Sequence, residues 1–304
     1  MQFGSKKSVR QFIEPRQVKR DIPKQGGVVI CALAFGLSSA VVSLAQTPTV
    51  HDLIHAQLED LMDMQVTSVA KKEQTLSKAG AAVYVITQAD IRTSGATNIP
   101  DLLRMAPGVD VARIDANSWA ITVRGFNDRY ANKVLVLVDG RSVYSPSFSG
   151  VFWDAQDVPL EDIERIEVIR GPGGTVWGAN AMNGVINIIT KSAKNTKGGL
   201  IATGAGSQTT ADGLAQYGGG IGSKGTYRVY AKYFSLGNFD LASGAPAWDG
   251  GHTLHAGFRS DWDLSPRDTL TVQGDLQNSK EGETYTECSP TRCRDRRLLM
   301  TVST

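Results

Sequence analysis

The sequence predicts a small α+β domain followed by the first strands of an antiparallel transmembrane β-barrel. Between residues 82 and 190, short β-branched runs are mixed with short helical segments, too few and too brief for a doubly wound domain. From about residue 198 onward, segments of about ten residues alternate apolar and polar side chains, which is typical of barrel strands in a membrane. A basic, then uncharged, N-terminus indicates export.

Residues 1–45 have the features of a signal peptide. Basic residues precede Gly26–Val42, which carries no charge, and Ser43 and Ala45 supply the small residues of a cleavage site before Gln46. The alternative is a transmembrane anchor, but the apolar run is shorter than the ~20 residues that a spanning helix needs. We therefore expect a secreted or envelope protein whose mature chain begins at Gln46.

The charge balance argues against a nucleic-acid partner. The chain holds 32 basic and 30 acidic residues, of which seven basic and two acidic residues lie in the signal peptide. The mature chain would therefore carry 25 basic and 28 acidic residues, a net charge of −3. A chain without a basic excess is a poor candidate for binding nucleic acid.

The α+β domain is predicted from six β-rich runs and three helical segments. Asn98 can cap a helix whose first turn contains Pro100, and two acidic residues after Leu160 suit the first turn of another. The expected strands are Val83–Thr87, Val109–Arg113, Ala120–Arg124, Val134–Val138, Ile166–Ile169 and Val185–Thr190, and the expected helices are Gln88–Ser94, Pro100–Met105 and Leu160–Arg165.

The barrel strands are predicted from alternation and from connection lengths. The expected strands cover residues 199–207, 213–222, 226–237, 252–264 and 269–279. Connections at 223–225 and 265–268 are short and the one at 238–251 is long, as expected for periplasmic turns and external loops. The alternative is a soluble antiparallel sheet with one wet face. Cys288 and Cys293 would lie in a third external loop and, in an exported protein, form a disulfide.

Several ordered motifs resemble one known family. The glycine-rich segment Arg165–Lys191, with strands on either side of Gly171–Gly184, resembles the end of the plug domain of TonB-dependent outer-membrane receptors. The segments Ala82–Arg92, Asn98–Val109, Ile121–Phe126 and Lys133–Arg141 resemble its earlier parts, the last two its central strands. The resemblance implies a non-enzymatic receptor in the bacterial outer membrane, in contact with its lipid, with a barrel of 22 strands. The chain would then be its N-terminal part, truncated near Thr304.

The resemblance also implies a domain plan and a partner. It places a periplasmic segment at residues 46–75, the plug at 76–195 and the start of the barrel at 196–304. The isolated β-rich stretch near residue 66 resembles the TonB box, an extended segment that adds to a sheet edge of TonB in the inner-membrane energising complex. The predicted TonB-binding residues are Met64, Gln65, Val66, Thr67, Ser68 and Val69. The alternative is an ordinary first strand of the plug.

Two loops are candidates for a ligand site. Family members bind substrates at the outward apices of the plug, and these loops combine aromatic residues with arginines that could meet an anionic group. The candidates are Arg129, Tyr130, Arg141, Tyr144, Phe148 and Trp153. Alternatively, the aromatic residues pack against the barrel wall. The expected ligand is a ferric siderophore, with a cobalamin-like corrinoid or another metal chelate as the alternative, and a passive porin or adhesin as the rival function.

The sequence gives no support for catalysis, a metal site or a cofactor. Gly171–Gly178 lacks the lysine of a P-loop, and Gly220–Gly225 matches a dinucleotide motif by letter but precedes a strand. His252 and His255 would lie on opposite faces of a strand. We therefore expect binding and movement rather than bond-making.

Overall fold

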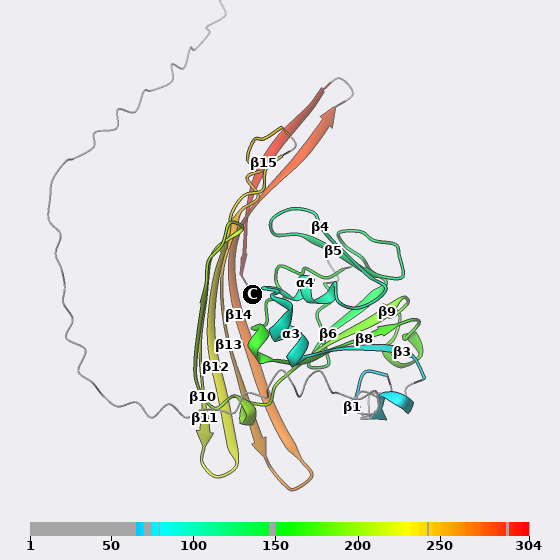
Figure 1. The fold of residues 1–304 in the computed structure, drawn as a ribbon, viewed down its shortest axis with the longest axis vertical. Helices are drawn as coiled ribbons and strands as arrows, with labels where there is room; N and C mark the ends of the chain where they lie inside the picture. Colours follow the sequence, from blue (N-terminus) through cyan, green and yellow to red (C-terminus); the bar gives the residue numbers. More distant parts are fainter. Residues whose placement is uncertain are drawn as a thin grey trace, which may run out of the picture. The chain divides into compact units, whose positions relative to one another are not determined.

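The computed structural model describes residues 65–69, 74–78, 80–145, 150–241, 243–289 and 292–303, with side chains as far as Glu283. Within these residues the chain forms two larger sheets and two short two-stranded ones (Figure 1). The predicted signal peptide, Met64 and Phe148 lie outside the described residues. No described helix is long and apolar enough to span a membrane.

The N-terminal α+β domain is built on a five-stranded sheet. Its strands are β3 (Ala82–Thr87), β8 (Ile163–Arg170), β9 (Gly184–Thr190), β6 (Val134–Val138) and β7 (Arg141–Ser142), in the order β3-β8-β9-β6-β7. Only the β6–β9 pair is parallel. The strands β4 (Val109–Arg113) and β5 (Trp119–Val123) form a separate antiparallel pair. The expectation that the segment around β5 is a central strand was therefore wrong, because β5 hydrogen-bonds to its own hairpin partner.

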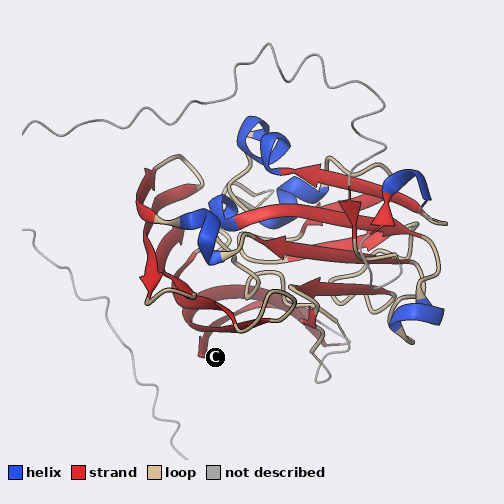
Figure 2. Cartoon of the chain, turned by 90° about the horizontal axis from the view of Figure 1, so that it is seen from below, coloured by secondary structure: helices blue, strands red, loops and turns tan. Residues whose placement is uncertain are grey.

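The helices are short, as the blue segments of Figure 2 show. The helix α3 (Gln88–Ser94) has the predicted bounds; it begins with a capping box between Thr87 and Asp90 and ends at Gly95, whose φ is 69°. The helix α4 (Ile99–Leu103) is capped by the side chain of Asn98, as predicted. A one-turn helix α5 (Gly174–Trp177) lies in the glycine-rich segment, where no helix was expected.

The third predicted helix, Leu160–Arg165, was wrong. Residues Leu160–Asp162 form only one 3-10 turn, and β8 already begins at Ile163. Ile163, Ile166 and Val168 are all fully buried in the main core. The β-branched residues are accommodated by sheet pairing with β3 and β9, so tertiary packing overrides the local helix-start signal.

A six-stranded antiparallel sheet follows the α+β domain. Its strands are β10 (Gly198–Gly204), β11 (Thr209–Ile221), β12 (Gly225–Leu236), β13 (Gly251–Asp263), β14 (Thr269–Ser289) and β15 (Arg292–Ser303), each paired with the next. The five predicted strands are present, and the predicted short and long connections lie between them. The strand β15 and the upper half of β14 were not predicted.

The two faces of this sheet have inverted polarity relative to a soluble protein. Apolar side chains on one face are exposed: Val229, Tyr233, Leu254, Phe258, Leu270, Val272 and Leu276. Polar side chains on the other face are buried: Thr226, Arg228, Lys232, Thr253, His255, Asp261, Gln277, Ser279 and Glu281. A soluble sheet with one wet face has the opposite arrangement. The pattern is that of strands with an apolar face toward lipid and a polar face toward a lumen.

The hairpin of β14 and β15 gives the first prediction. Its backbone register places Cys288 directly opposite Cys293, and directly opposed residues of antiparallel strands lie close enough for a disulfide. We expect peptide mapping of non-reduced protein from outer membranes to show a Cys288–Cys293 linkage. Free thiols at both positions would contradict the pairing.

Candidate functional site

Residues 65–69 begin with a short strand and end in a turn, and they pack against the five-stranded sheet; we call them the docked segment. The strand β1 (Gln65–Val66) pairs antiparallel with β2 (Gln74–Thr75). Val66 and Ser68 are fully buried. A polar residue as buried as Ser68 needs hydrogen-bond partners, and it finds them on β9 and α5.

Glu167 on β8 receives the backbone of the docked segment. Its buried carboxylate accepts the backbone N–H of Thr67 at 3.1 Å and that of Ser68 at 2.8 Å. The guanidinium of Arg165 donates to the same carboxylate at 2.8 Å, which compensates its charge. Bonds to an ionised acceptor are stronger than neutral ones, so Glu167 is the main polar contact that holds the segment.

Ser68 is held from two further sides. The Asn187 side-chain amide donates to Ser68 Oγ at 2.9 Å, and the Trp177 indole N–H donates to the Ser68 carbonyl at 2.6 Å. The backbone donor and acceptor of Ser68 are therefore both occupied. Another strand can pair with Thr67 and Ser68 only after these contacts are released.

Removing the charge at Glu167 should release the docked segment. In Glu167→Gln the two backbone donors lose a charged acceptor, and hydrogen bonds to charged groups contribute about 1.5–3 kcal/mol each. We expect a nitroxide at position 65 to become at least about tenfold more populated in its mobile form, measured by electron paramagnetic resonance. Glu164→Gln is the matched control, because Glu164 pairs with Arg165 but is not bonded to the segment. Equal mobility in both variants would refute the clamp.

A second feature is a cavity of about 600 Å³, which we call the aromatic cavity. It is lined by five of the six residues selected from the sequence: Arg129, Tyr130, Arg141, Tyr144 and Trp153. Phe152 also lines it, and its ring meets that of Tyr130 edge to face at 5.7 Å. Residues of the two candidate loops therefore lie around the same cavity. Drug-sized ligands are bound in cavities of about this size.

Trp153 differs from the expectation of an exposed aromatic residue. It is only 6% exposed and belongs to the main hydrophobic core, together with Val151 and Trp119. Most of its ring is used for packing, and only a small part faces the cavity. This packing lies in the core of the α+β domain, and it is not the packing against the barrel wall that the alternative expected.

Both candidate arginines meet carboxylates of β14. Arg129 forms an ion pair with Glu283 and also donates to Ser118 Oγ at 3.1 Å. Arg141 Nη2 lies 3.6 Å from Asp275 Oδ1. These partners lie more than a hundred residues away along the chain, so the sequence offered no signal for the pairs.

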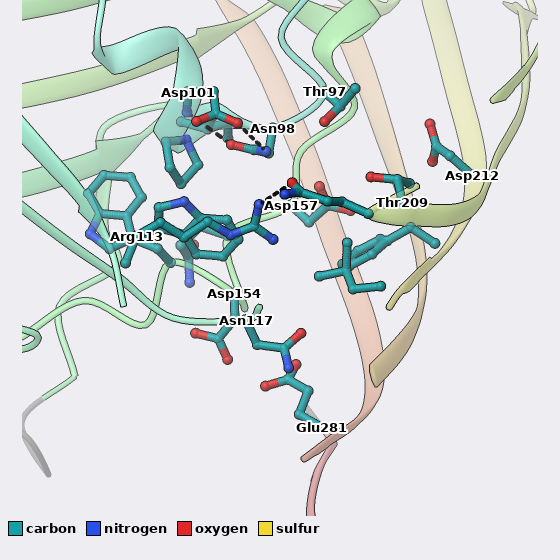
Figure 3. Close-up of a pocket in the computed structure, with 18 of the residues that line it drawn as sticks. Thr97, Asn98, Asp101, Arg113, Asn117, Asp154, Asp157, Thr209, Asp212 and Glu281 are labelled. Carbon is teal, nitrogen blue, oxygen red and sulfur yellow. Dashed lines mark hydrogen bonds between the residues drawn. The ribbon is translucent and has the colours of Figure 1, made fainter. Parts of the chain in front are cut away.

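A smaller cavity of about 110 Å³ lies between α4, β5 and the six-stranded sheet (Figure 3). Asp154, Glu281 and Asn117 all line it. Burial raises the pKa of Asp154 and lowers that of Arg113. The Lys232 ammonium donates to Asp157 at 2.6 Å. This cavity is much smaller than the aromatic cavity, and charged and apolar side chains line it together.

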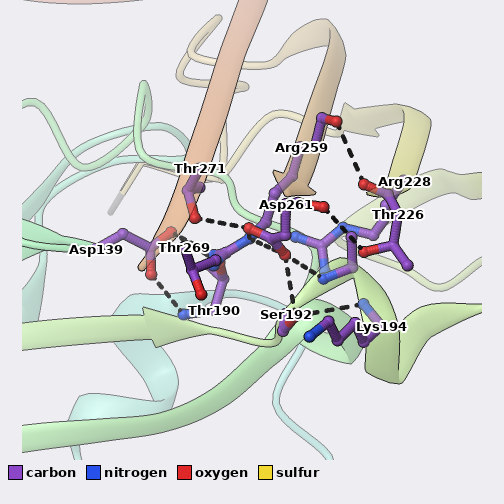
Figure 4. A network of polar contacts seen from close by, with 12 residues as sticks. Asp139, Thr190, Ser192, Lys194, Thr226, Arg228, Arg259, Asp261, Thr269 and Thr271 are labelled. Carbon is purple, nitrogen blue, oxygen red and sulfur yellow. Dashed lines mark hydrogen bonds and ion pairs between the residues drawn. The ribbon is translucent and has the colours of Figure 1, made fainter. Parts of the chain in front are cut away.

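A polar network joins the α+β domain to the sheet (Figure 4). The Asp261 carboxylate accepts the backbone N–H of Ala193 at 2.7 Å and the hydroxyl of Thr271 at 2.7 Å. Arg259 bonds to Asp261 and to Thr190. Arg228 Nε lies 3.1 Å from Asp162 Oδ2, and both side chains are at most 4% exposed. The sequence analysis did not select these residues. The available signal was their position on the polar face of predicted strands whose other face is apolar.

Comparison with known proteins decides what this arrangement is. Residues 75–185 match the family model of the TonB-dependent Receptor Plug Domain. The chain carries a TonB-dependent receptor plug domain. The chain is also 35% identical over 172 residues to the vitamin B12 transporter BtuB of Vibrio vulnificus, covering 56% of this chain and 27% of that protein. Against BtuB of Vibrio cholerae the identity is 32% over 194 residues, covering 63% and 31%.

Solved structures show the same fold around the plug domain. The pyoverdine outer membrane receptor FpvA of Pseudomonas aeruginosa aligns with a TM-score of 0.58 and 22% identity, covering 71% of this chain and 30% of that one. The ferric enterobactin receptor PfeA of the same organism aligns with a TM-score of 0.54 and 23% identity, covering 71% and 36%. The chain thus spans about a third of the length of these relatives. The relatives with the higher identity are thus transporters, and the structural neighbours are receptors.

Proposed function

We propose that this chain is the N-terminal part of a receptor that imports a bulky metal chelate across the outer membrane with energy from TonB. The observation that carries the proposal is the aromatic cavity on a plug domain whose docked segment is held by Glu167. The exposed apolar face of β12–β14 would contact outer-membrane lipid. TonB is the proposed partner, and no nucleic acid is expected.

The docked segment is the proposed TonB box. Its first two residues form a strand that pairs with β2, and its sequence alternates residue types as a strand does. Such a segment binds a partner by adding a strand to a sheet edge. Because Thr67 and Ser68 are bonded to Glu167, binding of TonB would require their release. If the docked segment is instead an ordinary first strand of the plug, its release from Glu167 should have no effect on transport.

The ligand class is the finer part of the proposal. The sequence alone favoured a ferric siderophore, whereas the curated relatives named above are vitamin B12 transporters at 32–35% identity. The siderophore receptors are similar at 22–23% identity, which supports the fold alone. We therefore place a corrinoid first and a ferric siderophore second. A deletion strain grown on a panel of cobalt and iron chelates would test both, and normal growth on every chelate would refute the proposal.

The aromatic residues should separate ligand binding from plug stability. In the full-length receptor, Tyr144→Ala should weaken chelate binding by about 0.5–1.5 kcal/mol beyond the area lost, with normal folding. Trp153→Ala should instead destabilise the plug by about 3–5 kcal/mol, because it empties the core. Phe148→Ala is expected to behave like Tyr144→Ala. The measurements are ligand affinity and leakage of a small antibiotic on the same variants; leakage without affinity loss in Tyr144→Ala would favour wall packing.

A further inference from the structure

The charges around the aromatic cavity bear on which chelates it can hold. Among the described residues that line it, the cations are Arg129 and Arg141, and the carboxylates are Asp154, Asp275, Glu281 and Glu283. Two positive groups thus face four acidic ones. Each of the two cations is already paired with a carboxylate that lines the same cavity, so the cavity has no surplus of positive charge.

Both arginines already have carboxylate partners, and Arg129 is held more firmly than Arg141. Arg129 is already bonded to Glu283 and Ser118, and both members of the ion pair are mostly buried, at 27% and 20% exposure. Arg141 and Asp275 are more exposed, at 62% and 42%, so their pair is the weaker one. An anion that takes Arg129 would leave the Glu283 carboxylate partly buried without a cation, which is strongly unfavourable.

We infer that the aromatic cavity selects uncharged or cationic chelates over anionic ones, and that Glu283 is the residue that sets this selection. The inference rests on the proposed ligand site, and it goes further by assigning a charge class and a determinant on β14. The walls fit this class, because the rings of Tyr130, Tyr144 and Phe152 can pack on a large neutral or cationic ligand without a counter-ion. It reverses the expectation that Arg129 meets an anionic group.

The test measures binding of a charge series to the full-length receptor in outer-membrane fragments, where TonB is absent. The probes are cyanocobalamin, its cationic aqua form and its anionic side-chain carboxylates, which share one scaffold. A cationic ferric hydroxamate and an anionic ferric catecholate form a second series. We expect the wild type to bind the uncharged and cationic members at least about tenfold more tightly than the anionic members of the same series.

Glu283→Gln should bring the anionic members to within about threefold of the neutral ones, because Arg129 then becomes available. The matched control is Asp263→Asn, which removes an ion-paired carboxylate of β13 that contacts Lys194 rather than the cavity. Equal wild-type affinity for anionic and neutral members, or an unchanged ratio in Glu283→Gln, would overturn the inference. Failure to bind any member would overturn it too. TonB-dependent uptake is measured separately, so its loss would count against the proposed function and not against charge selection.

Discussion

Replacing Val66 by proline in the full-length receptor is expected to abolish energised uptake while ligand binding at the cell surface remains. Proline removes the backbone N–H at this position and fixes φ, so residue 66 can no longer donate to a neighbouring strand. In the structure Val66 belongs to β1 and pairs with Gln74. The aromatic cavity is lined by other residues and should keep its affinity.

Two control variants distinguish the possible causes of a loss of uptake in Val66→Pro. Val66→Ala keeps the N–H but loses buried side-chain volume, so uptake should persist if strand pairing with TonB is what matters. Gln74→Pro disturbs the β1–β2 pair from the opposite strand and leaves the amino-acid sequence of the docked segment unchanged. Uptake of a radiolabelled chelate, alongside surface binding on the same cells, is the measurement. Normal uptake in Val66→Pro would remove residues 64–69 from the TonB interface.

The fold was largely predictable because its strands are marked by side-chain type. The run Val134–Val138 is apolar at every position and forms a buried strand between two neighbours. Gly184 begins β9 where a Cβ would lie 2.5 Å from the Ile169 carbonyl, so the glycine-rich stretch does mark close backbone approach. Alternation in Thr253–Leu264 predicted which face of β13 is apolar. Each of these signals depends on residues that are close together in the chain, so a single sequence is enough to detect it.

The site was only partly predictable, because its chemistry depends on long-range pairs. Arg129 and Arg141 were selected from the sequence as groups that could meet an anionic ligand, but their carboxylate partners lie on β14. Glu167 was read as part of a strand, and nothing in its sequence context indicates that it binds the backbone of Thr67 and Ser68, about a hundred residues earlier. Trp153 was assigned to a loop surface, but its neighbours in the core come from other strands.

Breaking the ion pair between Asp162 and Arg228 is expected to have the largest effect on the contact between plug and barrel sheet. Both groups are buried, and burial raises the pKa of Asp162 although Arg228 opposes that rise. Asp162→Ala leaves the Arg228 guanidinium with the Lys191 carbonyl as a remaining acceptor at 2.9 Å. Removing one partner of a buried pair costs about 3–5 kcal/mol. We expect this variant to unfold its plug at lower denaturant concentration and to admit small antibiotics.

The double variant Asp162→Leu with Arg228→Met decides whether the charges or the packing hold the plug. It fills similar volume and leaves no buried charge, and such replacements are often neutral or stabilising by about 1–4 kcal/mol. If the cost of Asp162→Ala comes from the unpaired guanidinium, the double variant should recover resistance to antibiotics. Recovery of resistance together with loss of uptake would show that the pair serves movement of the plug rather than its stability. If the double variant leaks as much as Asp162→Ala, the neighbouring Arg259–Asp261 ion pair depends on the pair between Asp162 and Arg228. The stability of the contact between plug and barrel sheet is then a property of the whole network.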